Sequence, residues 1–345
     1  MKLYSLSQEK LNELFALIAS KVDLFYPQDD STGKSDFKPY KEGAPLSKNL
    51  NTKRSAKDFF FPQTENLVDF RVEGKTIEIK PTPKLDRDFV IFGVRACDAK
   101  SFSILDTVFL NDPVDGFYKA RRDHAIIVTS ACNRPSETCF CTTLGIDPVN
   151  PDGDVSMWQT NKKVYFTPNT EKGEGFISII SQLVEEADWM EIREFIDGAK
   201  KVFENLPLKS VDFKKFFTDK PMMERYSDSR WAELYKTCLA CGTCTYVCPT
   251  CQCYDIKEFS NGNDVIRFRC WDSCMYSDFT KMSAGQPRPT QLERFRQRFM
   301  HKLVYYPMNN QGTPGCVGCG RCLASCPISM NIVKVAKKLS EEEAK

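Results

Sequence analysis

Two runs of cysteine with one shared spacing constrain the fold of this chain more than any other feature. In each run, three cysteines follow one another at intervals of three residues, and a fourth comes four residues later with a proline directly after it. This spacing wraps three thiolates around one [4Fe–4S] cluster. The first run is Cys238, Cys241, Cys244 and Cys248 with Pro249, and the second run is Cys316, Cys319, Cys322 and Cys326 with Pro327.

The repeat of the run predicts two clusters with exchanged ligands. In proteins with two clusters, the last cysteine of each run ligates the cluster that the other run holds. Zinc is the alternative occupant, although it is usually bound by cysteines in two pairs rather than by two runs of four closed by proline. The predicted ligand sets are Cys238, Cys241, Cys244 and Cys326 for one cluster, and Cys316, Cys319, Cys322 and Cys248 for the other.

Composition narrows the class of protein. A chain of 345 residues with 16 cysteines is too long for a small secreted disulfide-rich domain, and Met1–Ser5 is not an apolar signal segment, so we expect a reducing, cytoplasmic location. The apolar runs are shorter than the roughly 20 residues of a membrane helix. The formal charge of +2 gives no reason to expect nucleic acid or an anionic membrane as a partner.

Cysteine density divides the chain near residue 222. Four cysteines precede this point, and the other twelve follow it in about a third of the length. Length alone predicts two or three domains. We therefore predict an α/β domain over residues 1–222, a link over Lys215–Pro221, and a dicluster ferredoxin domain over residues 223–345.

Hydrophobic patterning predicts the elements of the first domain. Spacings of three and four residues indicate an amphipathic helix near the N-terminus, behind a capping box, and a polar stretch after it is expected to be loop. A later strand–helix–strand pattern predicts a β-α-β unit with buried strands. The ranges are Ser5–Gln8 for the box, Leu11–Ile18 for the helix, Tyr26–Leu46 for the loop, Lys75–Lys80 for an alternating strand, and Asp88–Val94, Ala96–Leu110 and His124–Thr129 for the β-α-β unit.

A third group of cysteines follows the two strands of this unit. Functional loops lie past the carboxyl ends of parallel strands, so these four thiols are expected to converge. We predict a third [4Fe–4S] cluster, for which Asp98 is a substitute ligand, while zinc and buried free thiols are the alternatives. The third cysteine group consists of Cys97, Cys132, Cys139 and Cys141.

The segment between the two runs favours a ferredoxin of the α-helical type. Cys248 and Cys316 are separated by 67 residues, and Gln291–Leu303 has apolar residues at helical spacing. The polar side of this helix is expected to be solvated or to contact an acidic partner. It carries Arg294, Arg296, Arg298 and Lys302.

Four cysteines lie outside the three groups. For these cysteines we favour packing near the clusters over ligation of a metal. They are Cys251, Cys253, Cys270 and Cys274.

Several segments in combination resemble one family, that of the iron–sulfur beta subunit of soluble sulfhydrogenases, with a similar pattern in the corresponding iron–sulfur subunit of anaerobic sulfite reductases. The resemblance covers nearly the whole chain from about Phe59 onward. The segments that carry it are Gly93–Asp98, Cys132–Thr142, Cys248–Cys253, Trp271–Cys274, Arg296–Lys302 and Cys316–Cys322.

The resemblance implies an electron-transfer component of an anaerobic cytosolic complex. Its partners would be an NAD(P)H-linked flavoprotein, carrying FAD with or without a [2Fe–2S] cluster, and a catalytic module, either a nickel–iron hydrogenase or a sirohaem sulfite reductase. The sequence has no nucleotide-binding glycine loop, so we expect a relay that is not catalytic alone. The alternatives are a sulfur or disulfide reductase acting through Cys97, Cys139 or Cys141, and a metal-stabilised scaffold without a redox role.

Overall fold

A mixed eight-stranded sheet forms the centre of the first half of the chain in the computed structural model, which describes residues 2–49, 51–80, 85, 87–213, 216 and 220–341. The strand order is β10-β1-β9-β8-β7-β6-β2-β3, and β2, β6, β7 and β8 run parallel. The strands are β1 (Leu3–Ser7), β2 (Asp23–Asp29), β3 (Ser35–Pro39), β6 (Phe89–Arg95), β7 (Ala125–Ser130), β8 (Val155–Gln159), β9 (Lys163–Pro168) and β10 (Glu185–Ala187).

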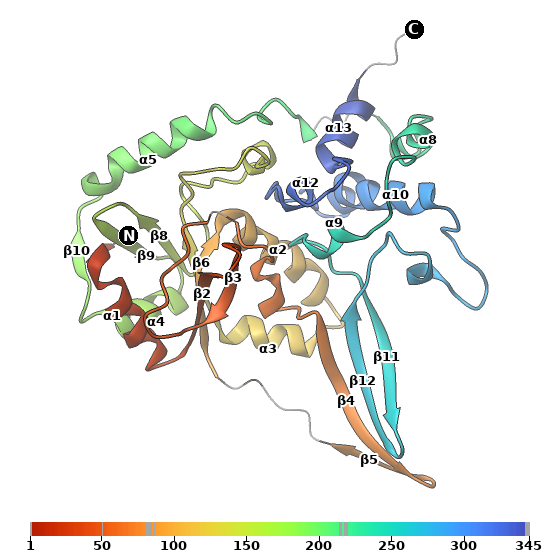
Figure 1. Ribbon diagram of the computed structural model, residues 1–345, viewed down its shortest axis with the longest axis horizontal. Helices are drawn as coiled ribbons and strands as arrows, with labels where there is room; N and C mark the ends of the chain where they lie inside the picture. Colours follow the sequence, from red (N-terminus) through yellow and green to blue (C-terminus); the bar gives the residue numbers. More distant parts are fainter. Residues whose placement is uncertain are drawn as a thin grey trace.

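Helices cover both faces of this sheet (Figure 1). Side chains alternate between the faces of a strand, so β6 sends Val90 and Phe92 to one core and Phe89 and Ile91 to the other. This alternation explains why the strand reads as a continuous apolar run. The first core lies under α1 (Leu11–Ala19) and α4 (Glu171–Ile180), and the second under α2 (Ala96–Phe109) and α3 (Gly116–His124).

The β-α-β unit is confirmed, whereas the predictions for the N-terminal region are partly wrong. The predicted helix over Leu11–Ile18 is present, but Ser5 and Ser7 belong to strand β1 and do not cap it. The predicted loop over Tyr26–Leu46 contains most of β2 and all of β3. Both strands contain proline and charged residues, so they lack the regular alternation of apolar and polar residues that predicts a strand.

A second, four-stranded sheet extends from the body as an arm (Figure 1). Its order is β11-β12-β4-β5, so strands from both sides of the predicted boundary share it, with Val68 opposite Arg267. The boundary near residue 222 stays a prediction, and most of the predicted link Lys215–Pro221 lies outside the described residues. The strands of the arm are β4 (Thr64–Glu73), β5 (Thr76–Lys80), β11 (Tyr254–Asn261) and β12 (Asp264–Trp271).

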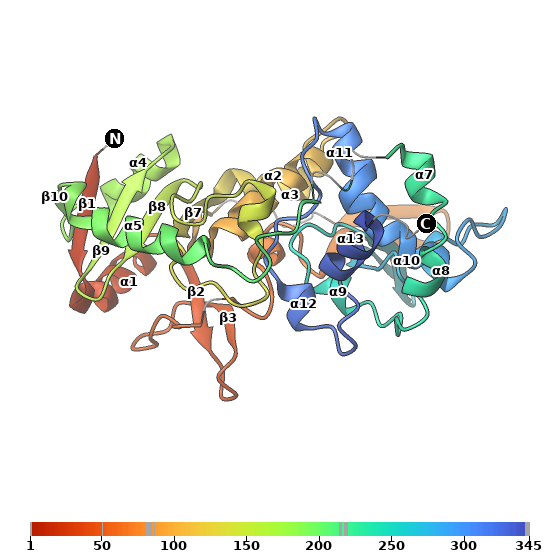
Figure 2. The same cartoon turned by 90° about the horizontal axis from the view of Figure 1, so that it is seen from above.

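Short helices gather at the end of the molecule opposite β1, β8 and β9 (Figure 2). The expected helix is present as α10, which begins with a capping box between Thr290 and Glu293 and continues into a π-helical segment, His301–Tyr305. The helices at this end are α7 (Met222–Tyr226), α8 (Trp231–Leu234), α9 (Thr243–Tyr246), α10 (Gln291–Met300), α11 (Tyr306–Asn309), α12 (Arg321–Ala324) and α13 (Ile332–Ser340). Helix α5 (Met190–Phe203) lies beside β1 and β9 instead.

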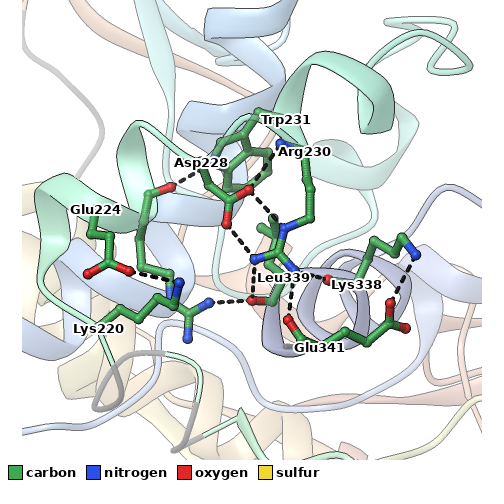
Figure 3. A network of polar contacts seen from close by, with 9 residues as sticks. Lys220, Glu224, Asp228, Arg230, Trp231, Lys338, Leu339 and Glu341 are labelled. Carbon is green, nitrogen blue, oxygen red and sulfur yellow. Dashed lines mark hydrogen bonds and ion pairs between the residues drawn. The ribbon is translucent and has the colours of Figure 1, made fainter. Parts of the chain in front are cut away.

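The last helix, α13, is fixed by a polar network (Figure 3). Arg230 pairs with Asp228 and donates to the backbone carbonyls of Lys338 and Glu341 at 2.8 Å. These carbonyls are at the end of a helix, where backbone acceptors lack helical partners. The network therefore ties the start of α8 to the end of α13. Within the described ranges, no helix is both long and apolar enough to span a membrane.

Candidate iron–sulfur centres

The two cysteine runs fold into loops with the same backbone geometry. Each has left-handed residues two and four positions after its first cysteine: Ala240 and Gly242 in the first run, Gly318 and Gly320 in the second. In both loops the first left-handed residue donates its amide N–H to the sulfur of the first cysteine, at 3.4 and 3.5 Å. Hydrogen bonds to cluster sulfurs tune reduction potentials.

The structure brings the predicted ligand sets together. Cys238 lies within electrostatic reach of Cys241, Cys244 and Cys326, which is the first predicted set. The exchange of the fourth thiol between the runs stays a prediction, because Cys248 lies within electrostatic reach of Cys244 in its own run as well. The second set is equally grouped, since Cys322 lies near Cys248, Cys316 and Cys319.

The donor chemistry of these sets fits a cubane. Burial raises the pKa of the Cys316 and Cys322 thiols, which are therefore protonated until a metal displaces the proton. No group of three or more histidine, cysteine, aspartate or glutamate side chains in the described part of the chain is arranged to hold a single metal ion. Four cysteine thiolates are the donor set that a [4Fe–4S] cluster takes.

Buried cations lie beside these thiols, which the sequence did not predict. Arg298 and Lys302 are 3% and 5% exposed, so the expectation that they form a solvated face is wrong for both. Arg298 donates to the Cys244 carbonyl at 2.9 Å, and the neighbouring thiols raise the pKa of both cations against the effect of burial. Lys57 is also buried and donates to the Cys251 carbonyl at 3.0 Å. Because buried charge requires compensation, these cations favour anionic groups in the space between the runs.

The third cysteine group lies where the strand order places it, past the carboxyl ends of β6 and β7. Cys141 is near Cys132 and Cys139, and Cys97 is near Cys141. Burial raises the pKa of Cys141 to about 12. A bulge in β6 at Gly93, whose φ is +80°, redirects the strand end that leads to Cys97.

This third group packs directly against the second run. The Phe140 amide donates to the Gly318 carbonyl at 2.9 Å, and Cys97 lies within electrostatic reach of Cys319. A Cβ added at Gly318 would lie 2.6 Å from the Cys141 nitrogen. The three cysteine groups therefore form one row, with the second predicted set in the middle.

Asp98 does not take the position of a substitute ligand. It is 1% exposed, and both of its oxygens accept hydrogen bonds from Arg321 in the second run. Arg321 also donates to the Thr52 carbonyl at 3.0 Å. Asp98 therefore ties α2 to α12 as half of a buried ion pair.

The contact at Gly318 gives a testable prediction. We expect Gly318→Ala to lower the free energy of unfolding by about 2–5 kcal/mol, because a left-handed alanine is strained and its methyl group would overlap the Cys141 backbone. Gly262→Ala is the matched control: its φ of +64° is similar, but a Cβ there has nothing within 4 Å. Denaturant unfolding under anaerobic conditions measures both. Equal losses in the two variants would contradict the close approach.

A large cleft borders the third cysteine group, and nothing in the sequence pointed to it. Its volume is about 1260 Å³, and it lies at the carboxyl ends of β2, β6, β7 and β8. Arg95, Arg134, Lys48 and Lys162 line it together with Asp98. Ligands of α/β sheets commonly bind at this edge. Side chains from distant segments build the cleft, so no local motif reveals it.

Comparisons with known proteins agree with this geometry. The 4Fe-4S dicluster domain family matches residues 237–330, and such a domain carries two [4Fe–4S] clusters. The chain is 33% identical to sulfhydrogenase 2 subunit beta of Pyrococcus furiosus over 262 residues, which are 74% of this chain and 75% of that protein. No solved structure gives a significant match. Identity over this share of both chains places the protein in the family of sulfhydrogenase beta subunits.

Proposed function

We propose that this chain is the electron-relay subunit of a cytoplasmic oxidoreductase complex. The observation that carries the proposal is the row of three cysteine groups, joined by the contact between Phe140 and Gly318. Bound [4Fe–4S] clusters supply one-electron chemistry. The protein holds their ligands in two loops of the same backbone geometry, directs amides at the cysteine sulfurs, and surrounds the thiols with buried cations.

The partners we propose are a flavoprotein and a catalytic module. The named relative is a sulfhydrogenase subunit, so we favour a hydrogenase over a sulfite reductase as the catalytic module. An NAD(P)H-linked flavoprotein is the proposed source or acceptor of electrons, because a flavin exchanges two electrons with a nicotinamide, whereas each cubane carries one. We also propose that residues 223–345 form a dicluster ferredoxin domain of the α-helical type, in which α9 and α12 carry the third cysteine of each run and contact each other.

The relay is tested by following cluster absorbance. The chain is mixed anaerobically with NADH or NADPH, alone and then with the flavoprotein that copurifies with it. We expect no reduction by the nicotinamide alone and rapid bleaching of the clusters once the flavoprotein is added. Rapid reduction without any flavoprotein would show that the chain has a nicotinamide site of its own and would overturn the proposal.

A third [4Fe–4S] cluster at Cys97, Cys132, Cys139 and Cys141 is part of the proposal. Three cubanes give about 12 iron atoms per chain, and Cys132→Ala is expected to lower the content to about eight. Iron and sulfide analysis of anaerobically purified protein measures this loss. Cys270→Ser is the control, because Cys270 is only partly buried and lies in the arm, and it should keep the full content. About eight iron atoms in both the parent and Cys132→Ala would eliminate the third cluster.

A further inference from the structure

Two buried cations on one side of a helical segment belong to the surroundings of the clusters. Arg298, in α10, and Lys302, in the π-helical segment after it, are four residues apart and are 3% and 5% exposed. In the described part of the chain, their side-chain hydrogen bonds go to carbonyl, hydroxyl and sulfur atoms, and none goes to a carboxylate. A buried positive charge requires a compensating anion, and the clusters with their thiolates are the anions expected beside it.

Arg298 lies between the two cysteine runs. One terminal nitrogen of its guanidinium donates to the Cys244 carbonyl at 2.9 Å, and the other donates to the Cys251 sulfur at 3.7 Å. The guanidinium is also within electrostatic reach of the Cys322 thiol in the second run. Its Nε is buried and has no hydrogen-bond partner among the described residues. Because an unpaired buried donor is costly, this side chain favours an anionic group between the runs.

Lys302 is connected to the second predicted ligand set through a hydroxyl group. Its ammonium donates to the Gly315 carbonyl, directly before the second run, at 2.9 Å and to Oγ1 of Thr250 at 2.6 Å. This oxygen lies 2.8 Å from the same carbonyl and 3.3 Å from the Cys248 sulfur. Since the ammonium already satisfies the carbonyl, the Thr250 hydroxyl can donate its proton to the Cys248 thiolate. Burial lowers the pKa of Lys302, but the neighbouring thiols raise it further, so the ammonium stays charged.

The two cations affect the free energy of the reduced clusters. A [4Fe–4S] core with four thiolates is anionic and reduction adds one more negative charge, so a nearby positive charge stabilises the reduced state more than the oxidised state. We propose that Arg298 and Lys302 set the reduction potentials of the dicluster domain: Arg298 raises those of both clusters, and Lys302 raises only that of the cluster with Cys248 in its ligand set. The proposal deepens the relay function and rests on it for its purpose, because cluster potentials decide the direction in which electrons pass.

The test is an anaerobic redox titration of the full-length chain with its clusters, reduced by dithionite and followed by electron paramagnetic resonance. Glutamine removes the charge of either cation and keeps a hydrogen-bond donor. We expect Lys302→Gln to move one one-electron step to a more negative potential, and Arg298→Gln to move that step and a second one. Each moved step should lose about tenfold in its equilibrium constant for reduction, which is about 59 mV. Arg296→Gln is the matched control: it removes a charge from the same helix, but Arg296 donates to the Tyr226 carbonyl at 3.1 Å, and no step should move.

Two outcomes would overturn the proposal. One is a full iron content with no moved step in either glutamine variant, and the other is an equal movement in Arg296→Gln, since loss of net charge alone would then explain the result. Where a glutamine variant loses iron, Thr250→Val replaces it, because this change keeps both cations and removes the hydroxyl between Lys302 and Cys248. It should move only the step assigned to Lys302, and an unmoved step with full iron would refute the connection.

The titration needs no flavoprotein, so it separates this proposal from the relay. Bleaching of the clusters by the copurifying flavoprotein is followed in the same preparations. If bleaching occurs while no step moves in the variants, the relay stands and the role of the two cations fails. If the steps move as expected but the flavoprotein does not bleach the clusters, the relay fails and the role of the cations stands.

Discussion

Replacing Arg321 with methionine is expected to lower the free energy of unfolding by about 3–5 kcal/mol, because the change leaves a buried carboxylate without its partner. Asp98 and Arg321 are 1% and 5% exposed, and their ion pair joins α2 to the loop of the second run. Urea unfolding of the anaerobic protein, followed by circular dichroism, measures the loss.

Two further variants control this expectation. Lys338→Met breaks an ion pair with Glu341 whose side chains are 56% and 58% exposed, so it should cost less than about 1 kcal/mol. The double variant Asp98→Leu/Arg321→Met removes both charges and should be more stable than Arg321→Met alone. An Arg321→Met protein as stable as Lys338→Met would contradict the buried pair.

If the runs exchange their fourth ligands, substituting the fourth cysteine of one run should damage the cluster that the other run holds. Cys326→Ser is expected to remove the cluster that the first run holds, with a loss of about four iron atoms, while the cluster at Cys316, Cys319 and Cys322 remains. Cys248→Ser should do the reverse. The physical reason is that Cys326 lies within electrostatic reach of Cys238 in the first run, and Cys248 lies within reach of Cys322 in the second.

Iron analysis and electron paramagnetic resonance of the reduced protein measure this exchange, because the two variants would keep different clusters and the remaining clusters would interact differently. Cys238→Ser is the matched comparison for Cys326→Ser, and both should leave the same cluster intact. If Cys248→Ser and Cys238→Ser instead damaged the same cluster, each run would hold all four of its own ligands.

Local patterns in the sequence predicted those parts of the fold whose residues are close in the chain. The apolar run of β6, the helix α2 and the strand β7 follow one another, and the cluster loops are set by fixed spacings. The pairing of β12 with β4 could not be predicted in this way, because the two strands are far apart in the sequence. Strand pairing between distant segments leaves no periodic signal in either segment.

The environment of the clusters was less predictable than their ligands. Arg298 and Lys302 occupy polar positions by helical spacing, and without a structure such positions indicate solvent. In the structure the thiols of both runs meet this side. Lys302, four residues after Arg298, lies on the same side and donates to the Gly315 carbonyl at 2.9 Å. A helical pattern in the sequence distinguishes the polar face of a helix from the apolar face, but it does not show whether the polar face contacts solvent or buried cysteine thiols.

The arm has a consequence for the order in which the chain is made. In the pairing of β4 with β12, Val68 is opposite Arg267, so the ribosome adds 199 residues after Val68 before this partner is complete. At about 5–20 residues per second, β4 waits roughly 10–40 s for its neighbour. During this time the β4–β5 hairpin has an unpaired edge, and Ile77 and Ile79 of β5 remain 63% and 70% exposed even in the finished fold. The nascent chain is therefore most prone to aggregation before residue 267 emerges, and slower translation would lengthen that interval.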